Sequence, residues 1–161
     1  MSKKEYYFSY EEFASAEELG EQDLQLLREA RKATEHAYAP YSHFRVGAAA
    51  RLSNGKIVTG TNQENASFPA GICAERTLLS TAASLFPGVG VDSLAVSYFN
   101  ENGPSDRPIS PCGICRQSLQ ETEQRADRPI RLIMGGQDGK VYIIPSAGAL
   151  LPLAFTGDEL K

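Results

Sequence analysis

Apolar residues recur along the chain at two different spacings, which predict helices and strands. Between Glu21 and Tyr38 the apolar positions recur every three or four residues, as expected for an amphipathic helix. Pro40 ends this helix, because the residue before a proline is pushed out of the helical region. A second helix is predicted from Ala74 to Leu85, and a third from Pro111 or Cys112 to Glu123.

Five other segments have the composition of strands. Residues 44–52 and 56–61 flank Asn54-Gly55, a dipeptide that strongly indicates a β-hairpin. These two strands should therefore be antiparallel neighbours. The remaining strands are predicted at residues 93–99, 130–134 and 141–144.

The order of these elements predicts an α/β fold, a three-layer α-β-α sandwich with a five-stranded mixed sheet. We expect residues 1–20 to form an N-terminal arm that packs on the domain or on a neighbouring subunit. Residues 21–161 should form a single domain, and the apolar tail at residues 150–155 should dock on it. Ligand sites in such folds tend to lie beyond strand ends, near helix N-termini.

Composition narrows the function classes. The chain has 161 residues, a formal net charge of −4 and 42% hydrophobic residues, which fits one globular domain and argues against a nucleic-acid partner. We expect no membrane span and no signal peptide, because no apolar run approaches about 18 residues and the first residues are polar. Three cysteines without a secretion signal are best interpreted as reduced thiols in a cytoplasmic protein.

All three cysteines lie in two short segments that predict a zinc site. Cys112 and Cys115 are three residues apart at a helix start, so both sulfurs can reach one metal ion. Cys73 must supply the third thiolate from another helix. Residues two apart in a helix point in nearly opposite directions, so Cys73 and Glu75 can face one metal only if Cys73 is the helix cap. Three protein ligands leave one tetrahedral position open for a water molecule.

Other interpretations of the cysteines remain open from the residues alone. A single cysteine is often a core residue, and an isolated Cys-x-x-Cys can be a redox pair. A closed structural zinc site would need a fourth protein ligand, for which His36, His43 or a carboxylate would have to serve. Each histidine is more commonly a surface or capping residue.

Two charged residues beside Cys73 suit catalysis. Glu75 could take a proton from a zinc-bound water and pass it to a substrate, although glutamates are also common in first helical turns because of the helix dipole. Three thiolates and one Zn²⁺ leave a net charge of −1, so Arg76 could restore the Lewis acidity of the metal. The simpler alternative for Arg76 is a solvated helix arginine.

Four segments, taken together, resemble the cytidine deaminase family, specifically its small homotetrameric nucleoside enzymes. They occur in the family's order at residues 39–49, 60–66, 71–77 and 110–117. The general pattern of zinc deaminases includes three cysteines and a glutamate that is not a ligand. The Cys-Ala-Glu version at residues 73–75 is similar to the free-nucleoside branch, whereas His-Ala-Glu is usual in enzymes acting on nucleic acid.

The resemblance implies hydrolytic deamination of cytidine and 2′-deoxycytidine to uridine and 2′-deoxyuridine in pyrimidine salvage, with one zinc ion per subunit. A zinc-bound water would attack C4, with Glu75 as the proton shuttle. Cys73, Cys112 and Cys115 would hold zinc. The implied substrate contacts are Phe44 and the backbone of Ala74 and Ser110 at the base, Asn62 and Glu64 at the ribose, and Phe155 from a neighbouring subunit.

Some features of the sequence leave alternatives open. Phe68 occupies a position where the family usually has tyrosine, and Thr156-Gly157 alters the usual Gly-Pro after the C-terminal aromatic residue. Asn62 and Glu64 are also residue types that stabilise turns. The alternatives are a deaminase of another amino-heterocyclic nucleoside and a non-catalytic zinc-stabilised binding module, which would need the metal but not Glu75.

Overall fold

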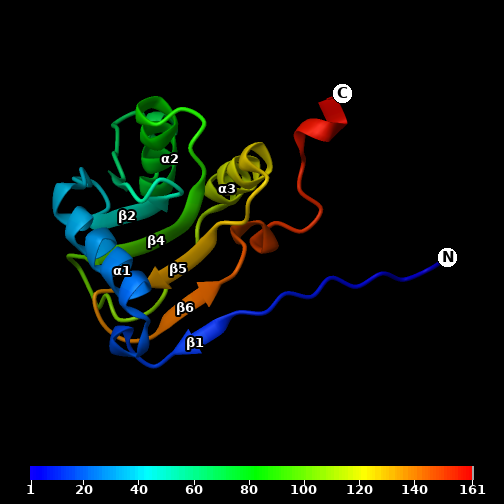
Figure 1. Cartoon of the computed structure of the whole chain (residues 1–161). Coiled ribbons are helices and arrows are strands. Elements are labelled where there is room, and N and C mark those ends of the chain that lie inside the picture. The colour runs from blue at the N-terminus through cyan, green and yellow to red at the C-terminus, as the bar shows by residue number, and fades with distance from the viewer. Residues whose placement is uncertain (161) are drawn as a thin grey trace.

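The fold is an α/β sandwich around one mixed sheet (Figure 1). The computed structural model describes residues 1–160, so Lys161 of the predicted domain lies outside the described residues. The helices are α1 (Glu21–Ala33), α2 (Ala74–Leu85) and α3 (Gly113–Ala126). The strands are β1 (Glu11–Phe13), β2 (Phe44–Leu52), β3 (Ile57–Thr61), β4 (Val91–Asn100), β5 (Arg131–Gly135) and β6 (Val141–Ile144).

The sheet has the strand order β1-β6-β5-β4-β2-β3 in the described part of the chain. Strands β4 and β5 are parallel, and all other neighbours in the sheet are antiparallel. Helix α1 covers one face, while α2 and α3 lie on the other (Figure 1). The predicted three-layer arrangement and the predicted hairpin are therefore confirmed.

The predicted number of strands was wrong, because β1 adds a sixth strand at the edge of the sheet. Glu11, Glu12 and Phe13 pair with β6. Glu12 also forms an ion pair with Lys140 at 2.6 Å. Such a short segment with two adjacent glutamates has no strand signal of its own, and its position depends on partners that lie about 130 residues away in the chain.

The first helix is shorter than predicted. It ends at Ala33 and is followed by a 3-10 turn at Thr34–His36, rather than continuing to Tyr38. The Thr34 hydroxyl donates to the carbonyl of Arg31 at 2.7 Å, and the Tyr38 amide donates to the carbonyl of Asn62 at 3.1 Å. Tyr38 is thus held beside the segment after β3. A helix continued to Tyr38 would not bring its amide to Asn62.

Each face of the sheet has its own hydrophobic core. The core under α1 includes Leu26, Leu27, Ile133 and Ile143. The core under α2 and α3 includes Leu78, Leu94, Leu119 and Leu132. Successive side chains of β4 point to opposite faces of the sheet and so contribute to both cores. Ala95 packs in the first core, and Leu94 and Val96 pack in the second. None of the helices in residues 1–160 has the length and hydropathy that a membrane span requires.

The segment after β6 is anchored to α3 through a buried carboxylate. Glu123 is 9% exposed, and it accepts hydrogen bonds from the amide of Ile130 at 2.7 Å, the hydroxyl of Ser146 at 3.0 Å and the amide of Gly148 at 3.1 Å. These donors satisfy a charge that would otherwise be costly to bury. They fix Ser146 and Gly148 against α3, the helix whose start carries Cys112 and Cys115.

The predicted docking of the apolar tail holds only in part. Leu150 packs against the core, but Leu153 is fully exposed and Phe155 is 59% exposed. Figure 1 shows this segment standing away from the sheet. The tail therefore presents apolar side chains outward instead of covering its own domain.

Helix α2 approaches the sheet closely because Gly60 of β3 has no side chain. A Cβ atom at this position would lie 2.5 Å from the amide nitrogen of Leu78 and 2.6 Å from the carbonyl oxygen of Ala74. Both contacts are helix backbone, which cannot rotate away. The glycine thus sets the distance between β3 and the helix that carries Ala74 and Glu75.

We expect Gly60→Ala to lower the free energy of unfolding by about 1–3 kcal/mol or more, since the added methyl group overpacks a helix–sheet contact. Urea unfolding followed by circular dichroism measures this change. Gly157→Ala is the matched control, because a Cβ there meets nothing within 4 Å, and it should stay within about 0.5 kcal/mol of the parent. Equal losses in both variants would contradict the packing explanation.

Candidate active site

Three cysteine sulfurs converge from two helix starts. Cys73 is the N-cap of α2 and Cys112 is the N-cap of α3, each with extended backbone angles, and Cys115 lies in the first turn of α3. The Sγ–Sγ distances are 3.7 Å from Cys73 to Cys112 and 3.5 Å from Cys112 to Cys115. The expected cap position of Cys73 is therefore present.

The spacing of the sulfurs fits a tetrahedral zinc ion. Zn–S bonds of about 2.3 Å place the sulfurs of a tetrahedral site about 3.8 Å apart. All three sulfurs lie within 4.8 Å of one another, and among residues 1–160 no histidine or carboxylate joins this group. His43 instead faces Glu101, with Nδ1 and Oε2 3.0 Å apart. The arrangement supplies three protein ligands and leaves a fourth position for a small molecule.

The cluster favours thiolate at Cys73. Hydrogen bonds with Cys115 and Cys112, together with the positive charge of Arg76, lower the pKa of Cys73 to about 6. The hydrogen bond with Cys73 and burial raise the pKa of Cys115. None of the hydrogen bonds in residues 1–160 joins Arg76 to a sulfur, so this arginine acts through its charge. A bound divalent ion would displace the remaining thiol protons.

Glu75 is a buried carboxyl group beside the cluster. It lies in the first turn of α2 and is 5% exposed. Burial raises the pKa of Glu75, and the negative charge of Cys73 acts in the same direction. A carboxyl group in such surroundings accepts a proton more readily than an exposed one, as a proton shuttle requires.

Glu75, Cys73 and Cys112 line an inner cavity of about 200 Å³. The predicted residues Asn62, Ala74 and Ser110 also line it, as do Val46 and Ile109, which sequence reasoning did not single out. Ala74 is fully buried, whereas Ser110 is exposed. The inner cavity therefore brings together six of the predicted site residues: Asn62, Cys73, Ala74, Glu75, Ser110 and Cys112. The predicted residues Phe44 and Cys115 do not line it.

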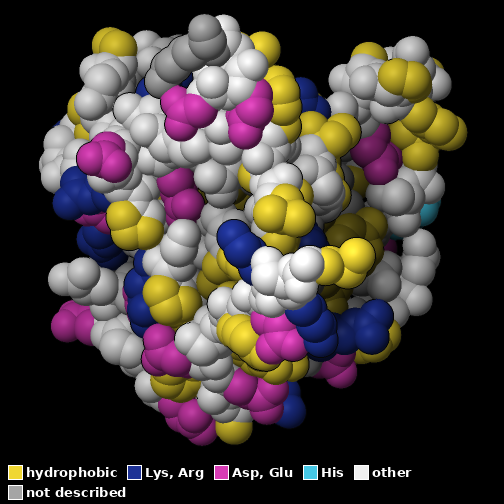
Figure 2. All heavy atoms as spheres, turned by 90° about the vertical axis from the view of Figure 1, so that its right-hand side faces the viewer, with side chains coloured by type: hydrophobic (Ala, Val, Ile, Leu, Met, Phe, Trp, Pro, Cys, Tyr) yellow, Lys and Arg dark blue, Asp and Glu magenta, His cyan; other side chains and the backbone are white. Residues whose placement is uncertain are grey.

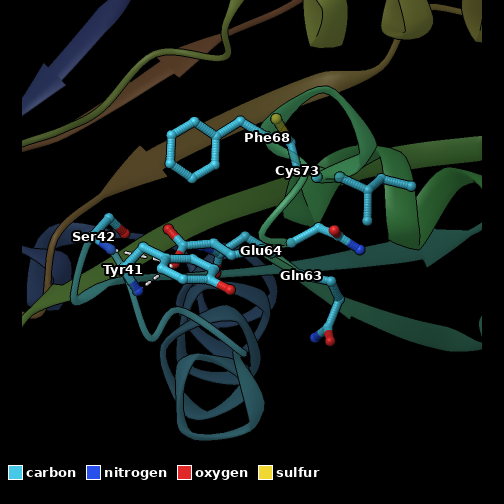
Figure 3. Close-up of a pocket in the computed structure, with 10 residues that line it drawn as sticks. Tyr41, Ser42, Gln63, Glu64, Phe68 and Cys73 are labelled. Atoms are coloured by element: carbon cyan, nitrogen blue, oxygen red, sulfur yellow. Dashed lines mark hydrogen bonds between the residues drawn. The ribbon is translucent and has the colours of Figure 1, made fainter.

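An outer cavity of about 480 Å³ adjoins the inner one, and the two share Asn62 and Cys73. Figure 3 shows the outer cavity, with Glu64 lying beside Tyr41 and Ser42 and with Phe68 near Cys73. The rings of Tyr41 and Phe68 meet edge to face, with their centroids 5.9 Å apart. Phe68 is 75% exposed, so the outer cavity has an open aromatic rim.

Glu64 is held by the loop before β2. Its Oε2 accepts hydrogen bonds from the amides of Tyr41 at 2.9 Å and Ser42 at 3.3 Å (Figure 3). The Ser42 hydroxyl and these amides hold the pKa of Glu64 below its ordinary value. The group is therefore an ionised acceptor, suited to hydroxyl groups of a ligand.

The side chain of Asn62 already has partners within the protein. Its Oδ1 accepts from the amide of Val46 at 2.8 Å, and its Nδ2 donates to the carbonyl of Phe44 at 2.9 Å. An amide group offers two donors and two lone pairs, so one N–H and one lone pair remain for a ligand. Asn62 thus joins the start of β2 to the segment after β3.

Phe44 is backed by a residue that sequence reasoning missed. Its ring stacks on Tyr98 of β4, with the centroids 4.8 Å apart and the ring planes 15° apart. Tyr98 is 2% exposed. Knowing the pairing of β2 with β4 would have revealed this contact, since Val46 lies opposite Tyr98 and Phe44 lies opposite Asn100.

Phe155 lines neither cavity of its own subunit. Its carbonyl accepts a hydrogen bond from Nε2 of Gln117 at 2.9 Å, while the ring is 59% exposed. The predicted role of Phe155 in the site of a neighbouring subunit stays a prediction.

Comparison with known proteins identifies the family. Residues 20–127 match the family described as "Cytidine and deoxycytidylate deaminase zinc-binding region". The chain belongs to the cytidine deaminase family. It is 37% identical to a cytidine deaminase of Halalkalibacterium halodurans over 84% of this chain and 96% of that protein. It is also 37% identical to one from Mycobacterium tuberculosis over 86% and 93% of the two chains.

Solved structures agree with this membership. The crystal structure of a cytidine deaminase from Burkholderia pseudomallei superimposes with a TM-score of 0.72 at 38% identity, covering 85% of this chain and all of that one. The zinc-binding region of the family includes all three cysteines. The cofactor of this family member is zinc, one ion per subunit, and the cluster of Cys73, Cys112 and Cys115 fits it.

We expect Cys112→Ala to reduce the zinc content from about one ion per chain to a small fraction of that, because two thiolates do not form a zinc site of this kind. Cys112 is exposed, so the substitution removes little packing. Metal analysis of the dialysed protein measures the loss. Glu75→Gln serves as the control and should retain zinc, and full occupancy of the Cys112 variant would contradict the assignment.

Proposed function

We propose that this chain is a zinc-dependent cytidine deaminase, which hydrolyses cytidine and 2′-deoxycytidine to uridine and 2′-deoxyuridine with release of ammonia. The observation that carries this proposal is the buried Glu75 carboxyl group, which lines the same small cavity as Cys73 and Cys112. A structural zinc site has no need of a buried carboxylate at the end of a ligand cavity. The family membership and the relatives named cytidine deaminase support the same reaction.

The proposed chemistry needs one group that moves protons. Zinc, held by Cys73, Cys112 and Cys115, supplies a Lewis acid with an open position that lowers the pKa of water. The Glu75 carboxylate accepts a proton as the water oxygen adds to C4 of the base, and it delivers this proton to ring N3. Glu75 then takes the second water proton from the hydroxyl group added at C4 and passes it to the amino group, so that the C4–N bond breaks, ammonia leaves and the C4 carbonyl of the product forms.

The two connected cavities suggest how a nucleoside is oriented. We place the base in the inner cavity, with its amino group and edge against Ser110 and the backbone of Ala74, and with Phe44 against its ring. The sugar then lies toward the outer cavity, where Glu64 accepts a hydroxyl group and Asn62 offers its remaining N–H. A site that hydrogen-bonds a hydroxyl group discriminates strongly against analogues that lack it.

The charge of the outer cavity favours a nucleoside over a nucleotide. None of its ten lining residues is a lysine or arginine, and Glu64 contributes a negative charge. A 5′-phosphate placed near this carboxylate would be repelled and would find no positive partner among those residues. This feature separates cytidine from deoxycytidylate, the two substrates in the description of the family.

Further parts of the proposal concern residues around the site. Arg76 offsets the net charge of −1 left by three thiolates and Zn²⁺, and its effect on the pKa of Cys73 supports this role. Phe155 reaches the cavity of a neighbouring subunit in a homotetramer, and the exposure of its ring supports this arrangement. We assign residues 21–161 to the catalytic domain, residues 1–20 to an arm, and the enzyme to pyrimidine salvage in the cytoplasm.

Glu75→Gln should lower kcat for cytidine by about 100- to 10,000-fold, the usual contribution of a general acid–base group, while zinc content and secondary structure are retained. Ammonia release from saturating cytidine measures the effect. Glu121→Gln is the matched control, since Glu121 is an exposed glutamate of α3, and it should deaminate at the parent rate. A Glu75 variant that holds zinc and keeps full activity would contradict the proposed mechanism.

Cytidine 5′-monophosphate should be deaminated with a kcat/KM about 100-fold or more below that of cytidine, since a few kcal/mol of repulsion act near Glu64. Steady-state assays of both compounds provide the ratio. Glu64→Gln should bring the kcat/KM values of the two compounds closer together, because it weakens binding of the nucleoside and removes the repulsion of the 5′-phosphate. Comparable values for the two substrates in the parent protein would rule out this basis for specificity.

A further inference from the structure

Residues 6–10, which we call the aromatic segment, have the sequence Tyr-Tyr-Phe-Ser-Tyr and precede β1. Their four aromatic side chains are between 49% and 80% exposed. The segment lies outside residues 20–127, which match the family. The solved relative from B. pseudomallei is matched over its whole length by only 85% of this chain. The function of this segment therefore needs an explanation beyond the shared catalytic domain.

Two contacts with its own subunit hold the aromatic segment in place. The Tyr6 hydroxyl donates to the carbonyl of Ala149 at 3.1 Å. The ring of Tyr10 lies against that of Tyr142, with the centroids 4.9 Å apart. Between these contacts, Tyr7 is 80% exposed and Phe8 is 49% exposed. The two outer tyrosines thus present the two middle rings in a fixed place, which reduces the entropy lost when a partner binds.

The chain exposes more surface than a compact monomer of its size. Its accessible surface is 9206 Å², whereas a folded monomer of 17.5 kDa is expected to expose about 7,900 Å². The excess of about 1,300 Å² exceeds the roughly 800 Å² that each partner contributes to a standard interface. Burying the extended ends of the chain against a partner would remove this excess.

Both extended ends lie on one side of the molecule. In Figure 1 the N-terminal residues and the C-terminal tail extend to the same side of the sheet. Figure 2 faces that side and shows hydrophobic side chains exposed among acidic and basic ones. The tail adds the exposed rings and chains of Leu153, Phe155 and Leu160. Two apolar segments on one face can cover each other in a twofold pair, where each copy presents the same surface.

We propose that the aromatic segment packs against a second copy of this chain, with Tyr7 and Phe8 as its main contacts. Tyrosine and phenylalanine are enriched at the centres of protein interfaces. The Tyr7 hydroxyl already donates to the carboxylate of Glu5, so its ring is the surface that remains to be covered. This assignment concerns assembly and does not depend on the deaminase activity.

The charges near the segment favour this partner over a membrane or a nucleic acid. Residues 1–10 contain two lysines, Lys3 and Lys4, and one glutamate, which is fewer than the four to eight basic residues of a lipid-binding cluster. The whole chain has a net charge of −4. Residues 1–5, which precede the aromatic segment and carry a slight positive charge, therefore meet an acidic second copy favourably.

The test compares the full chain with a Tyr7→Ser, Phe8→Ser double variant. Sedimentation over a concentration series should show an assembly of the full chain, with a dissociation constant about tenfold lower than that of the double variant, in line with the loss of two aromatic contacts. Leu85→Ser is the matched control, since Leu85 is 64% exposed on α2, and it should assemble like the parent. Zinc content and thermal unfolding show that each variant is folded.

Hydrogen exchange makes the test independent of other contacts between copies. Amides of residues 6–9 should exchange more slowly as the full chain assembles, by about tenfold or more, and this protection should be absent in the double variant. Fast exchange at these residues in the assembled protein, equal dissociation constants for parent and double variant, or a full chain that stays monomeric would overturn the proposal. Flotation with phosphatidylserine vesicles that requires Tyr7 and Phe8, without self-association, would instead identify a membrane surface.

Discussion

The convergence of three sulfurs on one point is the constraint on which the rest of this structure depends. Cys73 and Cys112 occupy the N-caps of two different helices. The sulfurs can therefore meet only if both helices pack at the right distance from the sheet. Gly60 allows the backbone of α2 to touch β3, and Glu123 ties α3 to the segment after β6. At the start of α2, hydrogen bonds within the cluster and the positive charge of Arg76 lower the pKa of Cys73 and favour its thiolate.

Burial then divides the site into two chemical environments. In the inner cavity, low solvent exposure raises the pKa of Glu75 and prepares it to accept a proton. In the outer cavity, amides and a hydroxyl of the loop before β2 lower the pKa of Glu64 and keep it charged. The surroundings of these two carboxyl groups thus shift their pKa values in opposite directions.

Several residues near the site also hold neighbouring segments of the protein together. Asn62 uses one donor and one acceptor to hold the start of β2, and keeps one of each. Phe44 stacks on Tyr98 of β4 and so joins the start of β2 to the central strand. Arg116 reaches from α3 to the carbonyls of Pro111 and Leu150. Through these contacts the residues around the two cavities are tied to the sheet and to the C-terminal segment.

Local signals in the sequence determined the elements and the metal chemistry of this protein. The start of α2 at Ala74 and the cap position of Cys73 follow from helix geometry and from the need to aim Cys73 and Glu75 at one point. Tertiary structure decided what depends on strand register and distant partners. It added β1, whose two glutamates find Lys140 and Arg131 only in the folded sheet. It placed Tyr98 under Phe44, and left Leu153 and Phe155 exposed where their apolar character predicted docking. Sequence periodicity specifies which face of an element is apolar, whereas which surface meets that face is set by packing across the whole chain.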